Sequence, residues 1–432
     1  MRKSILISFF LVMFTISMAQ DRAVLPEEYA KIAYKATYEG VNDKIIHLPE
    51  GSFQKSTAFA PNETQIGNTQ YDLQTNKLLG NRIYRFDDGT IGATWTMGLQ
   101  ATSFPDRGTG YNYYDGSSWG NEPTERIESI RTGWPSYAPW GEEGEIVVSH
   151  EFGAHVLYFN TRSVKGTGAW NEFTYAYTGG PQYLSWPRLV TSGPDYNNVH
   201  LLANTFEAYE GMETATVYSR STDGAATWDI ENIIIEGMGS DYYFDLPADE
   251  YVWAEPRNGY LAFLCASAWH DMFMMKSDDN GDTWEKTVIW EHPYPFFDWN
   301  TTITDTFFCV DNSASITLDY EGKAHVVFGI NRVLHDAVGT SYFLFPYIDG
   351  IGYWNEDMET FSNDLDALAP PYLGYANSEM VEDHNYIGWM QDVDGDGEII
   401  LNTDIMYYRE LGPSTMPTIH VDENDFRYVL YA

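Results

Sequence analysis

The chain has 432 residues, of which 63 are acidic and 24 are basic, so its formal net charge is −39. A field of this sign repels nucleic acid and anionic membranes, which excludes both as partners, and it favours cations. Hydrophobic residues make up 44% and aromatic residues 16%, which excludes a disordered acidic chain and favours β-structure with surfaces that stack on sugars.

Residues 1–19 have the pattern of a secretory signal peptide. A positive start is followed by an apolar stretch, and Ser17 and Ala19 are the small residues that precede a cleavage point. The alternative is a membrane anchor, for which the apolar stretch is short. We therefore expect export to the extracellular medium, the cell surface or the periplasm, without membrane insertion.

Residues 20–80 are expected to form a segment that precedes the repeated part of the chain. Within it, residues 68–76, NTQYDLQTN, are a candidate for a ring-closing strand.

Residues 81–432 carry a repeat with a period near 50 residues. Gly-containing turns end in a tryptophan five times, at intervals of 51, 58, 56 and 70 residues: Trp119, Trp170, Trp228, Trp284 and Trp354. The chain is too long for one ordinary core, and this period is typical of β-propeller blades, each a four-stranded sheet. Six segments read as a strand, a polar turn and a strand: residues 82–95, 133–150, 185–204, 253–267, 315–329 and 417–432.

The sequence thus predicts an all-β, six-bladed β-propeller whose last blade is incomplete. The chain stops at Ala432, where two further strands would follow. Either residues 25–80 return to close the ring, or the sequence is truncated at its C-terminus. Residues 355–416 exceed a normal connection and are expected to form an insertion or an elaborated blade edge.

Two of the repeats share an unusual order of side chains. Residues 277–284, SDDNGDTW, and residues 221–228, STDGAATW, place Ser, Asp, Thr and Trp at the same offsets, with Ala225 at the second copy's Gly position. An Asp that accepts turn amides, a Gly with positive φ and a buried Trp suit a tight hairpin. These segments resemble the Asp-box (BNR) repeats of sialidase-type six-bladed propellers and of other secreted propellers. The resemblance implies that the boxes lie at the blade periphery and are structural.

The same resemblance implies candidate catalytic residues. Sialidases clamp a substrate carboxylate with three Arg, and they use a Tyr nucleophile assisted by a Glu, with an Asp as acid/base. Arg82, in NRIYRFDDGT, matches the first Arg, although Tyr84 stands in place of a Pro. Asp106, in FPDRGTG, sits comparably to the acid/base Asp, and Glu250 corresponds to the assisting Glu.

The rest of that pattern is not kept. Ala266 or Ser267 stands where the second Arg is expected, and Arg257 and Arg332 are the remaining candidates later in the chain. No motif selects a Tyr nucleophile, although several, such as Tyr342, could be named. The Arg triad is incomplete, so the sequence does not support catalysis.

Arg82 and Asp106 also have ordinary structural interpretations. Arg82 would form a salt bridge with Asp87 or Asp88 on the same strand turn, and Asp106 would pair with its neighbours in a loop. The alternative for Arg82 is a place in the central channel, which blade-starting residues line.

The segment QDVDGDGEIILN offers alternating carboxylates and a Gly turn, which suits Ca²⁺ with its six to eight oxygen ligands. Thr403 stands where a full loop of this kind has a bidentate Glu. Either a structural calcium site or a solvated acidic turn fits this segment. The candidate ligands are Asp392, Asp394, Asp396 and Glu398.

Cys265 and Cys309 are the only cysteines. In an exported protein they form either one disulfide or two free thiols buried in apolar strands.

Two functions remain. The first is a secreted, monomeric propeller that binds a glycan or an extracellular protein, with the aromatic-rich loops at residues 108–120 and 291–300 stacking on sugars or covering blade edges. The alternative is a sialidase-like glycoside hydrolase that acts at the central channel. An enzyme of that kind needs two carboxylates that face one axial pocket.

Overall fold

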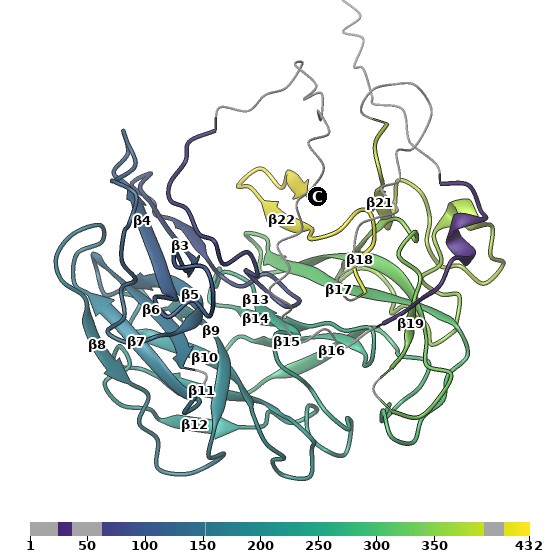
Figure 1. The fold of residues 1–432 in the computed structure, drawn as a ribbon, viewed down its shortest axis with the longest axis horizontal. Coiled ribbons are helices and arrows are strands. Elements are labelled where there is room, and N and C mark those ends of the chain that lie inside the picture. Colours follow the sequence, from purple (N-terminus) through teal and green to yellow (C-terminus); the bar gives the residue numbers. More distant parts are fainter. Residues whose placement is uncertain (1–24, 37–62, 152, 340, 393–409) are drawn as a thin grey trace, which may run out of the picture.

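The computed structural model describes residues 25–36, 63–151, 153–339, 341–392 and 410–432. Its strands form antiparallel sheets arranged as a ring around a central axis, seen along that axis in Figure 1. Within these ranges helix is limited to two short 3-10 turns, Tyr29–Lys31 and Pro371–Leu373. No described helix has the length and apolar character that a membrane span needs.

Five of the sheets are blades, in which strands that follow one another along the chain pair as neighbours. Blade one contains β2 (Ile83–Arg85), β3 (Ile91–Met97) and β4 (Gly108–Tyr114). Blade two contains β5 (Gly133–Trp140), β6 (Gly144–Glu151), β7 (Val156–Arg162) and β8 (Asn171–Thr174). Blade three contains β9 (Leu184–Ser192), β10 (Asn198–Thr205), β11 (Thr216–Ser221) and β12 (Ile230–Ile233). The first strands of adjacent blades contact one another, so they lie nearest the axis.

Blades four and five continue the ring. Blade four contains β13 (Tyr251–Trp253), β14 (Leu261–Cys265), β15 (Met272–Ser277) and β16 (Glu285–Trp290). Blade five contains β17 (Phe307–Leu318), β18 (Ala324–Leu334), β20 (Ile351–Asn355) and β21 (Tyr386–Gly388), with β19 (Phe343–Leu344) and β1 (Tyr34–Lys35) at one edge. The fourth strand of blade five, β21, therefore lies inside the expected insertion at 355–416.

The middle strands of blades two to four are covered on both faces, because each of these blades is packed between two others. The clearest case is β10, whose sequence NVHLLANT has seven of its eight residues buried. A strand that is buried on both faces shows a nearly continuous apolar run instead of strict alternation. Two large apolar clusters result, one centred on blades two to four and the other on blades four and five.

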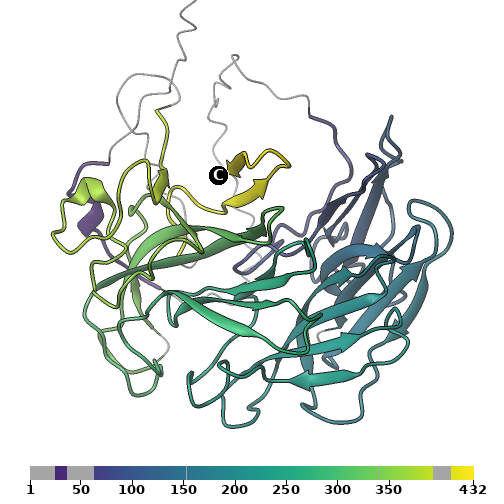
Figure 2. The ribbon, with the colours of Figure 1, turned by 180° about the vertical axis from the view of Figure 1, so that it is seen from behind.

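The sixth position in the ring holds a two-stranded hairpin. It consists of β22 (Thr418–Val421) and β23 (Arg427–Leu430), and β22 contacts β17 and β18 of blade five. The hairpin lies in the opening between blades five and one in both views (Figures 1 and 2). Leu430 is 74% exposed, so the described residues leave this part of the hairpin uncovered. The all-β propeller is confirmed, with five blades and a partial sixth.

The ring-closing strand expected at 68–76 is not found. These residues form no strand and do not pair with β23. Thr69 and Gln74 instead bond to the end of β3, where the Thr69 hydroxyl accepts from the Gly98 amide (3.0 Å) and the Gln74 side-chain oxygen accepts from the Thr96 amide (2.9 Å). Polar side chains that satisfy backbone groups at the end of a strand compete with strand pairing.

The two boxes form the same hydrogen-bonded turn after the third strand of their blades. The Ser277 hydroxyl donates to Asp279 (2.8 Å) and accepts from the Gly281 amide (2.9 Å). The Asp279 carboxylate also accepts from the amide and the hydroxyl of Thr283 (2.9 and 2.7 Å). The copy at 221–228 has the same bonds, and Ala225 takes the left-handed conformation (φ 72°) of the missing Gly. The fold is an Asp-box β-propeller.

The box tryptophans join neighbouring blades. The Trp284 ring lies 5.2 Å from that of Tyr218 in blade three, and the Trp228 ring lies 5.8 Å from that of Phe159 in blade two. Trp354 is different, because it lies within β20 and not in a turn. The structural interpretation of the boxes thus agrees with their packing at the junctions between blades.

Candidate functional site

The innermost strands of blades two to five share a backbone irregularity at one end of the axis, which we call the axial face. Each has a non-glycine residue with positive φ in the strand or just before it: Trp134 (52°), Trp186 (50°), Asp249 (66°) and Asn312 (63°). In β5, β9 and β17 the pairing register shifts at these residues. Bulges and left-handed residues of this kind are costly, and they gather at functional sites where they re-aim a side chain.

Two of these residues bring indole rings together. The rings of Trp134 and Trp186 lie 6.5 Å apart, and each lies 5.2–5.3 Å from the imidazole of His150. The guanidinium of Arg107 sits 5.2 Å from the Trp134 ring and 5.1 Å from the ring of Tyr71. The signal for these residues was present in the sequence, because Trp-Pro occurs in both GWPSYAP and SWPRLV at the start of a blade.

Arg82 lies at the axial face, as its position at the start of blade one suggested. Its guanidinium donates to the Gln74 carbonyl (2.6 Å) and is not paired with Asp87 or Asp88 among the described contacts. Burial, together with the positive charge of Arg188, lowers the pKa of Arg82 to about 9, although Asp249 opposes this shift. The salt-bridge interpretation of Arg82 is therefore wrong for the described residues.

The second guanidinium near Arg82 comes from Arg188, which the sequence reasoning missed. Arg188 lies on β9, two residues after Trp186, and donates to the Leu78 carbonyl (2.7 Å) and to the Asp249 carboxylate. Arg257 and Arg332 lie elsewhere. Arg257 donates to the carbonyls of Leu318 and Val421, and Arg332 lies against three aromatic rings, those of Phe308, Phe345 and Tyr375.

Glu250 is buried and fully engaged at the start of β13. Its carboxylate pairs with the Lys77 ammonium, accepts from the Ser267 hydroxyl (2.9 Å) and lies 2.8 Å from Nε2 of His270. Burial lowers the pKa of His270 to about 4, so the imidazole is neutral at pH 7. Its Nδ1 lies 2.6 Å from the Asp271 carbonyl, so both ring nitrogens face acceptors, and a neutral ring, which has one N–H, donates to only one of them.

Asp106 belongs to a different local structure. Its carboxylate accepts from the backbone amides of Leu99 (2.7 Å) and Gln100 (3.2 Å) in the turn between β3 and β4. No described hydrogen bond or ion pair joins Asp106 to Arg82 or to Glu250. The three predicted catalytic residues thus occupy three separate contact networks.

The N-terminal segment lies across the axial face and forms part of it. The amides of Asn76 and Leu78 donate to the side chain and the carbonyl of Asp249 (3.0 and 3.1 Å), and Leu78 is fully buried. Carbonyls of the same segment occupy the guanidinium groups of Arg82 and Arg188. The chain's own backbone therefore occupies one nitrogen each of Arg82 and Arg188, whereas Nε of Arg82 has no hydrogen-bond partner among the described residues.

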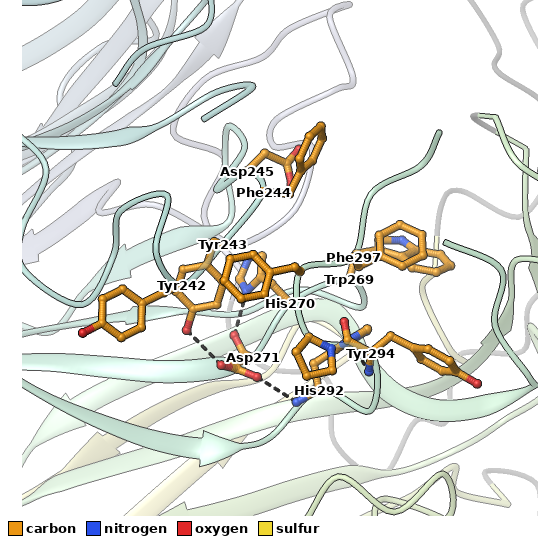
Figure 3. A pocket seen from close by; sticks show the side chains of 12 residues that line it. Tyr242, Tyr243, Phe244, Asp245, Trp269, His270, Asp271, His292, Tyr294 and Phe297 are labelled. Carbon is orange, nitrogen blue, oxygen red and sulfur yellow. Dashed lines mark hydrogen bonds between the residues drawn. The ribbon is translucent and has the colours of Figure 1, made fainter. Parts of the chain in front are cut away.

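Beside this network, the loops at the axial end of blade four form a small pocket (Figure 3). Asp271 anchors it, accepting from the Tyr243 hydroxyl (3.0 Å) and from the His292 amide (2.8 Å), and the Lys286 ammonium donates to the same hydroxyl (2.6 Å). The cavity measures about 30 Å³, enough for a water molecule but not for a sugar ring. Tyr242 and Phe296, also in the pocket wall, are 48% and 50% exposed, so a ligand would lie over their rings.

Asp245 is a second carboxylate in the wall of this pocket. It lies apart from Asp271 in Figure 3, with His270 between them. Burial raises the pKa of Asp245 above its usual value, although His270 and Lys77 oppose the shift. No hydrogen bond to its carboxylate is found among the described residues.

The predicted calcium ligands fall largely outside the described residues. Asp392 is described and buried, whereas Asp394, Asp396 and Glu398 lie outside the described ranges, so this site stays a prediction. Asp319, His325 and Asp425 place ligand atoms within 4.8 Å of one another. Hydrogen bonds explain the position of His325 without a metal ion. Its Nε2 lies 3.3 Å from Asp319, and its Nδ1 lies 2.7 Å from the Tyr353 hydroxyl.

Both cysteines are free and buried in the structure. Of the two alternatives, two free thiols is therefore the one observed, and no disulfide joins the blades that carry them.

Comparison with known proteins finds similarity only among solved structures. No family model matches the chain, and no curated protein is detectably similar to it. A Trypanosoma rangeli sialidase matches with a TM-score of 0.41 and 13% identity over 83% of this chain and 51% of that protein, so the chain spans about half its length. The NanB sialidase of Streptococcus pneumoniae matches with a TM-score of 0.40 and 11% identity, over 85% of this chain and 67% of that one. A Penicillium chrysogenum α-L-arabinanase matches with a TM-score of 0.39 and 12% identity, over 59% and 77%. Because these TM-scores and sequence identities are low, no residue role is transferred from these proteins to this chain.

Proposed function

We propose that the chain is an exported propeller that binds a glycan, free or on a protein, at its axial face without catalysis of its own. The observation that carries the proposal is the state of Glu250. Lys77, Ser267 and His270 use its carboxylate oxygens, so this group is not free to act as a base. Export is supported by the pattern of residues 1–19.

The exposed aromatic rings at the pocket favour a sugar as the ligand. An aromatic face offers apolar contact to the C–H face of a sugar, and the polar groups around it fix the orientation. Tyr242 is held by the Lys286 ammonium, which lies 5.0 Å from the ring centre. Asp271 supplies a polar group beside it.

A glycan array probed with the mature chain, residues 20–432, tests this function. We expect retention of one class of glycan, and about tenfold weaker retention in Tyr242→Ala and in Phe296→Ala, since an aromatic contact contributes about 1 kcal/mol or more beyond its buried area. Tyr320→Ala, at an aromatic residue that is 53% exposed near the start of β18, is the matched control and should bind as the wild type does. Retention of no glycan, or equal loss in the control, would contradict the proposal.

A glycoside hydrolase is the second candidate, and Asp245 is the observation that favours it. A half-buried carboxyl whose pKa is raised by its surroundings suits a general acid. Hydrolysis assays on the retained glycans separate the two functions. Turnover that is lost in Asp245→Asn, or turnover of a sialoside that is lost in Arg82→Ala, would establish an enzyme and overturn the binding proposal.

A further inference from the structure

A second recess lies at the junction of blades one and two. It is bounded by β4 with the turn that follows it, and by the end of β7 with the β7–β8 turn. Its volume is about 400 Å³, within the range of about 300–1,000 Å³ that small-ligand sites occupy. We call it the junction groove, and the residues that carry the argument are Tyr113, Asp115, Trp119, Arg162 and Gly166.

Aromatic rings line the junction groove in fixed positions. Trp119 pairs with Tyr114 through an isolated β-bridge, and their rings lie 5.7 Å apart. Gly166 packs directly on Tyr113, since a Cβ at Gly166 would lie 2.3 Å from a carbon of that ring. Tyr113 and Trp119 are both half-buried, so each keeps part of its ring open. Rings held in this way provide contact area without an ordering cost when a ligand binds.

A buried guanidinium with unused capacity lines the same groove. Arg162 is 9% exposed, pairs with the fully buried Glu145 and donates to the Gly168 carbonyl (3.4 Å). Its Nη2 atom is buried and has no hydrogen-bond partner among the described residues. A buried donor without a partner costs free energy. Nη2 is closed to solvent and the guanidinium lies between the rings of Tyr111 and Trp170 (4.5 and 4.3 Å), so a ligand oxygen satisfies this donor once the guanidinium turns toward the groove.

Asp115 supplies an acceptor at the rim. Its Oδ1 takes three hydrogen bonds, from the amide and hydroxyl of Ser117 and the amide of Ser118, all at 2.8 Å. No described residue donates to its Oδ2. The groove thus combines a donor in Arg162 with an acceptor in Asp115, and a sugar hydroxyl can accept from the first and donate to the second.

The charge of the groove selects against an acidic ligand. Glu145 neutralises Arg162, which leaves Asp115 as the uncompensated charge, and the chain as a whole carries −39. A carboxylated or sulfated sugar would be repelled by both.

We propose that the junction groove binds a neutral sugar ring, stacked on Trp119 and Tyr113 and hydrogen-bonded to Arg162 and Asp115. The groove is built from blades one and two, whereas the small pocket beside the axial face is built from the loops of blade four. The proposal therefore does not depend on the function assigned to the axial face.

Ligand-observed saturation-transfer NMR tests this site on the mature chain. The probes are methyl β-galactopyranoside, methyl α-mannopyranoside and N-acetylglucosamine as neutral sugars, and glucuronate as the acidic one, each at up to about 10 mM. We expect at least one neutral sugar to bind and glucuronate to bind at least tenfold more weakly. Trp119→Ala should weaken the neutral sugar about tenfold or more, and Asp115→Asn, which keeps an oxygen for the turn, should weaken it several-fold.

Tyr428→Ala is the matched control, because this tyrosine is 57% exposed on the β22–β23 hairpin, and it should bind the sugars as the wild type does. Thermal melting of each variant separates loss of binding from loss of folding. Failure of all three neutral sugars to bind the wild type would overturn the proposal. Affinity unchanged in the folded variants Trp119→Ala and Asp115→Asn, or glucuronate binding as tightly as the neutral sugars, would overturn it as well.

Discussion

The ammonium of Lys77 pairs with the carboxylate of Glu250, although 173 residues separate them in the chain. The pair fastens the N-terminal segment to the start of blade four, and both side chains are nearly buried. Ser267 and His270 complete the surroundings of the carboxylate. The axial face is thus assembled from a segment outside the blades together with the inner strands.

Removal of one partner of this pair should destabilise the protein strongly. In Glu250→Ala the buried ammonium of Lys77 loses its counter-charge, so we expect the free energy of unfolding, measured by urea denaturation, to fall by about 3–5 kcal/mol. Lys77→Met combined with Glu250→Ala should cost less than the sum of the two single changes, because the double variant leaves no unpaired charge. Strict additivity would show that the two groups do not interact. Glu27→Ala, which breaks an exposed pair with Lys31, serves as the control and should leave stability unchanged.

The box at 277–284 provides a test of the turn that fastens blade four. Asp279→Ala removes a carboxylate that accepts two bonds from Thr283 and one from Ser277, so it should lower the free energy of unfolding by about 1.5–3 kcal/mol. Asp278→Ala is the matched control, since the neighbouring Asp278 is exposed and none of the described hydrogen bonds involves it. Equal effects of the two substitutions would mean that the box bonds contribute nothing to stability.

Asp311 should give the stability a component that decreases as the pH rises. Burial raises its pKa from 3.8 to about 6, although hydrogen bonds from Ser313 and Thr415 oppose the shift. The folded protein therefore holds a proton between about pH 4 and pH 6 that the unfolded chain has released, and this group's stabilisation is lost across that window. Two pKa units correspond to about 3 kcal/mol.

Asp311→Asn removes that titration. The free energy of unfolding of the variant, minus that of the wild type, should therefore increase by about 3 kcal/mol between pH 4 and pH 7. The difference between the two proteins cancels the other titrating groups. A difference that stays constant over this range would show that the pKa of Asp311 is not raised.

The two cysteines should be unreactive in the folded protein. Burial raises the pKa of both Cys265 and Cys309, which leaves the thiol as the dominant form and shields it from reagents. We expect a thiol-reactive dye to label neither cysteine under native conditions and both in denaturant without reductant. Labelling in denaturant that requires prior reduction would reveal a disulfide and contradict the free thiols.

The parts of the fold that were predictable are those encoded locally. A box of eight residues satisfies its own hydrogen bonds through Ser277, Asp279 and Thr283, so its sequence alone identifies the turn and its spacing identifies the blades. The strand–turn–strand openings were predicted for the same reason. The closing strand predicted at 68–76 is wrong, because Gln74 and Thr69 bond to the end of β3 and this preference has no local signature.

The site was harder to predict, because it depends on which blades meet at the axis. Arg82 could be placed there by its position at a blade start, but Arg188 reaches it from blade three, far away in the sequence. The left-handed residues Trp134 and Trp186 depend on bulges that pairing with the next strand creates. An alignment of the blade openings on their Trp-Pro pairs would have placed Arg188 on an inner strand.

The central claim is that the axial face binds a glycan and leaves it intact. The most direct measurement is mass spectrometry of a glycan retained on an array after prolonged incubation with the mature protein. The account predicts that the glycan is recovered with its mass unchanged and that its retention is about tenfold weaker in Tyr242→Ala. Recovery of shortened glycan from the wild-type protein but not from Asp245→Asn would contradict it.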